Sequence, residues 1–296
     1  MPAHFCTWTC GTTSTRRDST RKVQMNKCCV YMVNQHPLYM NMACNSIAML
    51  RKHSAIPVRV LLITDFARTT FSNTRNYPGL ELDVSDDAVK RMSDRLVVKC
   101  EEMGAEVKVL SPHAAETDYI HCNQSYMATE CPEELVMKMD ADTFLFGDIE
   151  PVFNAYDGYD VVALEADWFK KEKEWKPEWF GNQTPLSTAV ILFRNETAKR
   201  WGEFLPGMCR AYAEGDSDAA IWARNRKILY LRDELSLTPF VICNTLKWRL
   251  FREEHCCQIS APEFWKNIIA HAFGYNWLKA YQMLTGSKDL PLRAAQ

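Results

Sequence analysis

Short apolar runs alternate with segments of helical periodicity through the first half of the chain. The runs that predict buried strands are residues 28–33, 58–63 and 106–110. Between them, residues 38–53 carry apolar side chains at helical spacing, and residues 84–103 predict a second helix, with Ser85 as its N-cap and Gly104 as its stop. Strands that alternate with helices in this way are typical of a parallel sheet with crossover helices.

The pattern becomes less regular in the second half. Residues 134–139 form a fourth apolar run, and residues 160–164 and 189–193 predict further strands. Residues 196–212 predict a helix, whereas residues 168–179 are charged, aromatic and without periodicity. Since no segment resembles an interdomain linker, we expect a single α/β domain with a mostly parallel central sheet and helices on both faces.

The chain before the first strand carries no apolar periodicity. Residues 1–27 combine basic side chains with many Ser and Thr, and they lack the apolar core of a secretory signal. A disordered tail is the simpler interpretation of this composition, and a transit peptide is the alternative. We therefore expect the folded domain to span residues 28–296.

Composition argues against several classes of protein. A length of 296 residues with 47% hydrophobic content is enough for a substantial core. The 35 basic and 37 acidic residues give a net charge of −2, so no nucleic-acid partner is indicated. No run reaches the ~20 apolar residues that a membrane-spanning helix needs, so we expect no membrane span.

The 12 cysteines do not follow the spacing of a disulfide framework or a zinc site. Cys28 and Cys29 are adjacent, as are Cys256 and Cys257, and several cysteines lie within apolar runs. In such runs cysteine behaves as a small hydrophobic residue. We expect mostly free thiols, a reducing compartment and therefore a cytoplasmic location.

Two carboxylates follow the fourth apolar run directly. Asp140 and Asp142 are separated by one residue, and residues 144–146 after them are again apolar. Ligands of open α/β sheets collect at the carboxyl ends of strands, and residues i and i+2 of a strand point the same way. The pair can therefore share one divalent cation, which would neutralise charge on a diphosphate. The alternative is that these Asp residues only cap a turn.

Four segments around and after this pair carry a family resemblance. They are residues 138–153, 184–195, 215–222 and 269–274. They resemble the metal segment, the strand ending in Asn, the acidic helix start and the late His-x-x-Gly element of glycosyltransferase family 8, which includes glycogenin and lipooligosaccharide galactosyltransferases. The resemblance covers most of residues 28–280. It implies a GT-A fold in which residues 28–153 bind a nucleotide sugar and residues 154–296 face the acceptor.

The resemblance also implies a complete metal site. In the family the late histidine joins the two acids, which assigns His271 to the same cation as Asp140 and Asp142. An imidazole with two carboxylates suits Mn²⁺ better than Mg²⁺, which prefers oxygen ligands and water. The alternative for His271 is an ordinary core residue with satisfied hydrogen bonds.

Donor-binding and catalytic residues are implied in the same way. The candidate contacts to the donor, a UDP-sugar in this interpretation, are Asn34, Tyr39, Asp65, Lys138, Ser187, Thr188, Gly274 and Lys279. The candidate catalytic residues at the acidic helix start are Asp216, Ser217 and Asp218. The chain departs from the family in two places. Ser217 stands where the family usually has Gln, and a diphosphate-binding Lys after Gly274 is replaced or displaced to Lys279.

The sequence therefore predicts a metal-dependent glycosyltransferase, with Mn²⁺ or Mg²⁺ as cofactor and a glycan, protein or small molecule as acceptor. The family resemblance implies that the enzyme retains the configuration of the transferred sugar. Two other functions stay open. A degenerate transferase kept as a carbohydrate-binding module would also explain Ser217 and the lost lysine. A sugar-phosphate nucleotidyltransferase shares the sheet but needs a Gly-rich, basic loop after the first strand, and residues 34–37 contain no Gly, Lys or Arg.

Overall fold

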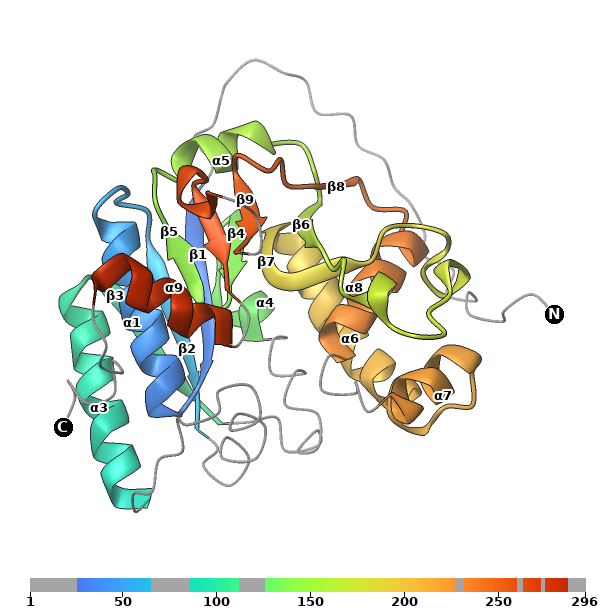
Figure 1. The fold of residues 1–296 in the computed structure, drawn as a ribbon, viewed down its shortest axis with the longest axis horizontal. Helices are drawn as coiled ribbons and strands as arrows, with labels where there is room; N and C mark the ends of the chain where they lie inside the picture. Colours follow the sequence, from blue (N-terminus) through green and yellow to red (C-terminus); the bar gives the residue numbers. More distant parts are fainter. Residues whose placement is uncertain are drawn as a thin grey trace.

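The computed structural model of the protein describes residues 26–64, 86–111, 126–226, 232–259, 263–272 and 275–286 (Figure 1). The first strand begins at Lys27, the last residue of the expected tail. The rest of that tail lies outside the described residues, and so does the N-cap expected at Ser85.

One mixed sheet of seven strands organises the molecule, in the order β3-β2-β1-β4-β7-β6-β8. Its strands are β1 (Lys27–Asn34), β2 (Val58–Ile63), β3 (Ala105–Leu110), β4 (Leu135–Met139), β6 (Val161–Glu165), β7 (Leu186–Arg194) and β8 (Trp248–Leu250). β7 runs antiparallel to both of its neighbours, β4 and β6, and every other pair of adjacent strands is parallel. The mostly parallel α/β sheet predicted from the sequence is confirmed.

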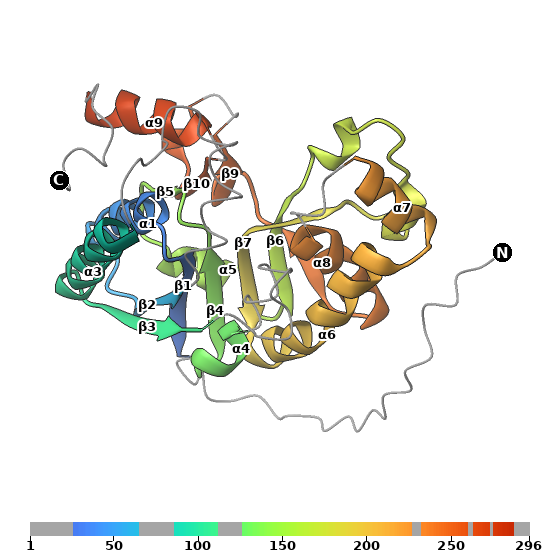
Figure 2. The ribbon, with the colours of Figure 1, turned by 90° about the horizontal axis from the view of Figure 1, so that it is seen from below.

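Helices cover both faces of this sheet (Figure 2). They are α1 (Pro37–Arg51) and α3 (Asp86–Glu102) on one face, and α4 (Tyr126–Glu130), α6 (Asn195–Glu214) and α8 (Arg232–Cys243) on the other. Tyr31 and Val33 of β1 pack in the apolar cluster of the first face, and Val30 packs in that of the second. Because alternate residues of a strand point to opposite faces, a strand covered on both sides must be apolar throughout.

α1 begins and ends at residues whose side chains explain its limits. His36 Nδ1 accepts a hydrogen bond from the backbone N–H of Leu38 at 3.2 Å, and Pro37 occupies the first turn. At the other end, the Arg51 guanidinium donates to the carbonyl of Ile56 at 2.7 Å. This arrangement places His36 directly after the carboxyl end of β1, at the edge of the sheet where a ligand is expected.

A second sheet, which the sequence did not predict, continues from β4. It consists of β5 (Thr143–Leu145), β10 (Ile269–His271) and β9 (Cys256–Gln258), in that order. β10 runs antiparallel to β5 and parallel to β9. The N–H of Ala272 donates to the carbonyl of Asp142 at 3.1 Å, so the late part of the chain is attached to the turn between β4 and β5.

The chain between β6 and β7 leaves the sheet and packs with α7 (Asp218–Asn225). Its short 3₁₀ helices are η3 (Phe169–Lys171) and η4 (Pro177–Phe180). Phe180 and Trp222 belong to the apolar cluster that joins this excursion to α7. The irregular segment expected at residues 168–179 is confirmed, apart from these two short helices. The remaining helices are α5 (Glu150–Ala155), η6 (Phe264–Lys266) and α9 (Tyr275–Thr285).

The cysteines of the described residues form no disulfide bonds, in line with the expected free thiols. The nine described cysteines are all free, and all except Cys243 are buried. Cys44 of α1 and Cys100 of α3 lie with their Sγ atoms 3.0 Å apart and share a thiol hydrogen bond.

Within the described ranges, the helices are too short or too polar to cross a membrane.

The substitution Trp277→Ala tests how α9 is held. Trp277 is 1% exposed, and its ring stacks on Phe144 of β5 with centroids 6.0 Å apart. Truncation should lower the free energy of unfolding by about 3–5 kcal/mol because it leaves a cavity under α9. Urea denaturation measures the loss. The control is Trp265→Ala, whose side chain is 46% exposed and should cost under about 1 kcal/mol. Equal losses in the two variants would contradict this packing.

Candidate active site

The turn that carries Asp140 and Asp142 lies at the carboxyl end of β4. The N–H of Asp140 donates to the carbonyl of Ala189 in β7 at 2.8 Å, and β5 begins at Thr143. The Asp142 side chain is 10% exposed and that of Asp140 is 38% exposed. Because β1 runs parallel to β4, the end of β1 reaches the same edge of the sheet. This is where ligands of open α/β sheets bind.

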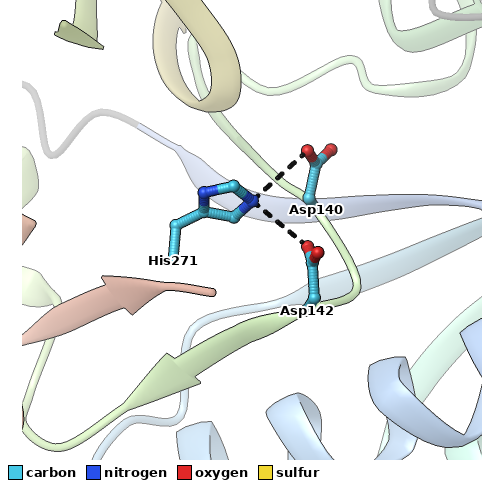
Figure 3. A group of neighbouring side chains, drawn as sticks. All are labelled: Asp140, Asp142 and His271. Atoms are coloured by element: carbon cyan, nitrogen blue, oxygen red, sulfur yellow. Dashed lines mark ion pairs between the residues drawn. The ribbon is translucent and has the colours of Figure 1, made fainter. Parts of the chain in front are cut away.

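His271 joins the two acids from the other end of the chain. It lies opposite Thr143 in the register of β10 and β5. Its Nε2 is 3.3 Å from Asp142 Oδ1 and 3.9 Å from Asp140 Oδ2 (Figure 3). One ligand atom from each of the three residues lies within 4.8 Å of the others. The structure thus brings together the three predicted metal ligands.

The imidazole of His271 is oriented by Gln258 of β9. His271 Nδ1 lies 2.9 Å from Gln258 Oε1, and since that oxygen only accepts, Nδ1 is the donor. Nε2 is buried and makes no hydrogen bond of satisfactory geometry within the described part of the chain. A histidine whose Nδ1 is bonded to an acceptor and whose Nε2 faces carboxylates has the usual arrangement of a metal ligand.

The pKa of His271 reflects the negative charge around it. Burial on its own lowers this pKa, but the carboxylates of Asp142 and Asp140 outweigh burial and raise it above the ordinary value. The two carboxylates therefore favour positive charge at Nε2, and a cation bound there would compete with a proton for this nitrogen. The residues present fit a divalent cation.

Lys138 was predicted to contact the donor, and the structure places it beneath the metal cluster. Its side chain is 1% exposed. Its ammonium donates to the carboxylate of Asp140 and to the backbone carbonyl of Thr188. The lysine therefore contacts one of the predicted metal ligands.

A second pair of acids, which the sequence reasoning missed, lies at the start of α8. Thr188 Oγ1 donates to Asp233 Oδ2 at 2.8 Å, and Ser187 Oγ donates to Glu234 Oε1 at 2.6 Å. Asp233 and Glu234 are 4% and 6% exposed. Ser187 and Thr188, both predicted donor contacts, thus hold the two acids against β7. In the sequence, these acids were recognisable only as an acidic first turn of an apolar helix. Other helices of the chain also begin with acidic residues, so this pattern did not single them out.

Glu234 lies within electrostatic reach of the metal cluster. Burial raises its pKa to about 7, with the charge of Asp233 adding to the shift and the Ser187 hydrogen bond opposing it. The charges of Asp140 and His271 also act on Glu234. Four acidic side chains therefore lie at this edge of the sheet, where the ammonium of Lys138 and the imidazole of His271 interact with members of the group. Such a concentration of acids favours a bound cation.

The residues predicted to be catalytic lie at the start of another helix, α7. Ser217 caps α7, where its Oγ accepts a hydrogen bond from the N–H of Ala220 at 3.3 Å. Asp216 and Asp218 are exposed. α7 lies at the outer end of the molecule, away from β4 and β5 (Figures 1 and 2). Among the described residues, the structure does not bring these three to the metal cluster.

The remaining donor candidates divide into two groups. Tyr39 of α1 is half-buried, and burial together with the charges of Asp142 and Asp140 raises its pKa. Asn34 ends β1 at the same edge of the sheet. Lys279 is exposed on α9. The other two candidates lie outside the described residues, and they are Asp65 and Gly274.

Solved glycosyltransferase structures share this fold. An active-site mutant of LgtC has a TM-score of 0.56 and 10% identity, covering 91% of this chain and 100% of that one. The galactosyltransferase LgtC in complex with donor and acceptor sugar analogues has a TM-score of 0.51 and 11% identity, with the same coverage of both chains. The bifunctional glycosyltransferase WbbM has a TM-score of 0.53 and 9% identity, and the match covers 86% of this chain and 46% of that one. No protein-family model and no curated protein matches the sequence.

These likenesses establish the class of fold. The seven-stranded, mostly parallel sheet with helices on both faces is the GT-A-like fold of those glycosyltransferases. At about a tenth of identical positions, the likeness concerns the fold alone. The acidic cluster at the carboxyl end of β4 is the feature of this chain that connects the fold with chemistry.

The pKa of Glu234 predicts how stability depends on pH. Because the folded pKa of about 7 exceeds the ordinary 4.5, the protonated side chain contributes stability that is complete below pH 4.5 and is lost as the pH rises through 7. In chelator, Glu234→Gln should therefore be more stable than wild type by roughly 3 kcal/mol at pH 8 and about equal to it at pH 4.5.

Urea unfolding of both proteins across this pH range measures the difference. Glu254→Gln serves as the control, because the Glu254 side chain is 64% exposed and pairs only loosely with Arg252 at 3.9 Å. A wild type and a Glu234→Gln variant with the same dependence on pH would show that Glu234 is ionised at neutral pH.

Proposed function

We propose that this protein is a metal-dependent glycosyltransferase that moves a sugar from a nucleotide-sugar donor, a UDP-sugar, to an acceptor. The observation that carries the proposal is the cluster of Asp140, Asp142 and His271 at the carboxyl end of β4. The fold shared with LgtC, solved in complex with donor and acceptor sugar analogues, supports it. A cation at this position would meet the diphosphate of a donor whose nucleoside lies against the end of β1.

In this proposal Asp140, Asp142 and His271 hold a divalent cation. The cation is Mn²⁺, because one imidazole nitrogen and two carboxylates suit this ion better than Mg²⁺. When bound, the cation stabilises the negative charge that develops on the departing nucleoside diphosphate. Asn34 and Tyr39 orient the nucleoside from the end of β1 and the first turns of α1. Burial lowers the pKa of His36 to about 4, so its imidazole stays neutral beside them and adds no charge to the nucleoside pocket.

We further propose that Asp233 and Glu234 face the transferred sugar, in the role that the sequence assigned to residues 216–218. Both carboxylates lie at the same edge of the sheet as the metal cluster. Buried carboxylates can accept hydrogen bonds from sugar hydroxyls and stabilise positive charge at the anomeric carbon. Whether the product retains or inverts configuration depends on how they are placed against the sugar.

The division of labour along the chain follows from this arrangement. Residues 28–153 carry the nucleotide side of the site, and residues 154–296 contribute the sugar-facing acids and the acceptor side. The half-buried tryptophans of the excursion between β6 and β7 offer rings for a glycan acceptor to stack on, and a protein or small-molecule acceptor fits the same proposal. The free, buried cysteines support a cytoplasmic location.

Donor hydrolysis tests the proposal directly. We expect the protein to hydrolyse at least one UDP-sugar of a panel, with Mn²⁺ and not with chelator. Asp140→Asn and Asp142→Asn should each lower the rate by about 100-fold or more, because each removes a charged ligand. Asp157→Asn is the matched control, since Asp157 pairs with Arg194 and is 53% exposed. Full activity of either ligand variant at limiting Mn²⁺ would contradict the site, and donor binding without turnover would indicate a binding module.

A comparison of Asp233→Asn with Asp216→Asn decides between the two sets of acids. If Asp233 faces the sugar, its variant should lose about 100-fold in turnover while Mn²⁺ affinity, measured by calorimetry, changes little. The Asp216 variant should lose much less, because that side chain is exposed just before α7. The reverse order of effects would return the catalytic role to α7.

A further inference from the structure

Lys138 is the one lysine that is buried among the residues described by the structure. It lies on β4 next to Met137 and Met139, which pack into the apolar core. A buried ammonium costs several kcal/mol unless it is paired and hydrogen-bonded. Here it has two partners, the carboxylate of Asp140 and the carbonyl of Thr188.

The two oxygens of Asp140 have different neighbours. Oδ1 accepts the hydrogen bond from the ammonium, and Oδ2 is the oxygen that faces His271 Nε2 at 3.9 Å. One oxygen is therefore committed to Lys138, and one is left for a cation. Oδ1 of Asp142 lies 3.3 Å from the same imidazole nitrogen.

We propose that Lys138 is a built-in counter-ion of the metal centre, a positioning residue that shares Asp140 with the exchangeable cation and weakens that cation's hold. The inference rests on the proposed function, in which Asp140 is a metal ligand. Without metal, the ammonium holds Oδ1 of Asp140, and Oδ2 faces His271. With metal, two positive charges act on one carboxylate, and their repulsion favours release of the cation.

The surroundings of Lys138 strengthen this effect. Its bond to the Thr188 carbonyl holds the ammonium between β4 and β7, and the Thr188 hydroxyl is bonded to Asp233. The ammonium is thus fixed in a dry position between the metal ligands and the second pair of acids, where charges interact more strongly than in water.

The experiment removes the charge and keeps the length of the side chain. Lys138→Met should bind Mn²⁺ about tenfold more tightly than wild type by calorimetry, because the competing positive charge is gone. The metal-free variant should melt at a lower temperature than wild type, and saturating Mn²⁺ should raise its melting temperature by more. Lys27→Met is the matched control. Lys27 is 11% exposed on β1 and pairs with Glu150, so its loss should leave Mn²⁺ affinity unchanged.

Each outcome is decisive. Unchanged or weaker Mn²⁺ binding by Lys138→Met, with tight binding by wild type and normal donor hydrolysis, would overturn the role of Lys138 and leave the proposed function standing. A wild type that takes up no Mn²⁺ would overturn both. If the methionine variant does not fold alone, it should fold when expressed and refolded with Mn²⁺, and Lys138→Gln, which retains a donor for Thr188, should show the tighter binding. Failure of both variants to fold at saturating Mn²⁺ would also overturn the inference.

Discussion

Negative charge at the end of a buried strand is the constraint that organises this molecule. β4 is buried along its whole length, and two carboxylates follow it directly, one of them largely buried, where positive partners offset the cost of burying charge. Lys138 compensates Asp140 from below, and His271 faces both acids from the side. The second sheet and the start of β7 hold these two partners in place.

In the second sheet, backbone pairing between short strands positions residues of the metal site. Three short strands bring β9 and β10 from late in the chain against β5, directly after the carboxylates. β10 carries His271, and β9 carries Gln258, whose oxygen orients the imidazole. The hydrogen bond from Ala272 to the Asp142 carbonyl ties the histidine strand to the acidic turn. Backbone pairing therefore sets the distance between ligands, and the side chains need only adopt compatible rotamers.

The likeness to LgtC and WbbM at 9–11% identity has a physical explanation. A sheet covered on both faces requires apolar strands and amphipathic crossover helices, and many sequences satisfy that pattern. The chemistry of a site tolerates much less change. In this chain the acids at the start of α8, bonded to Ser187 and Thr188, occupy the edge of the sheet that the fold makes available for ligands.

What the sequence determined by itself was local. The first four strands appear in the sequence as short apolar runs, and the two crossover helices appear as helical spacing of apolar residues. The carboxylate pair was visible because it follows one apolar run and precedes another. The bounds of α1, Pro37–Arg51, differ from the expected 38–53 by one residue at the start and two at the end, which is the usual uncertainty of helix ends.

Tertiary structure alone decided the rest. β9 and β10 have three residues each, too few for any periodicity, and they exist because they pair with β5 and with each other. Residues 216–218 and the pair Asp233 and Glu234 look alike in sequence, as acids at the start of a helix. Only packing distinguishes them, because α7 leaves its acids in solvent and α8 buries its own against β7, where a carboxylate needs hydrogen bonds and counter-charge.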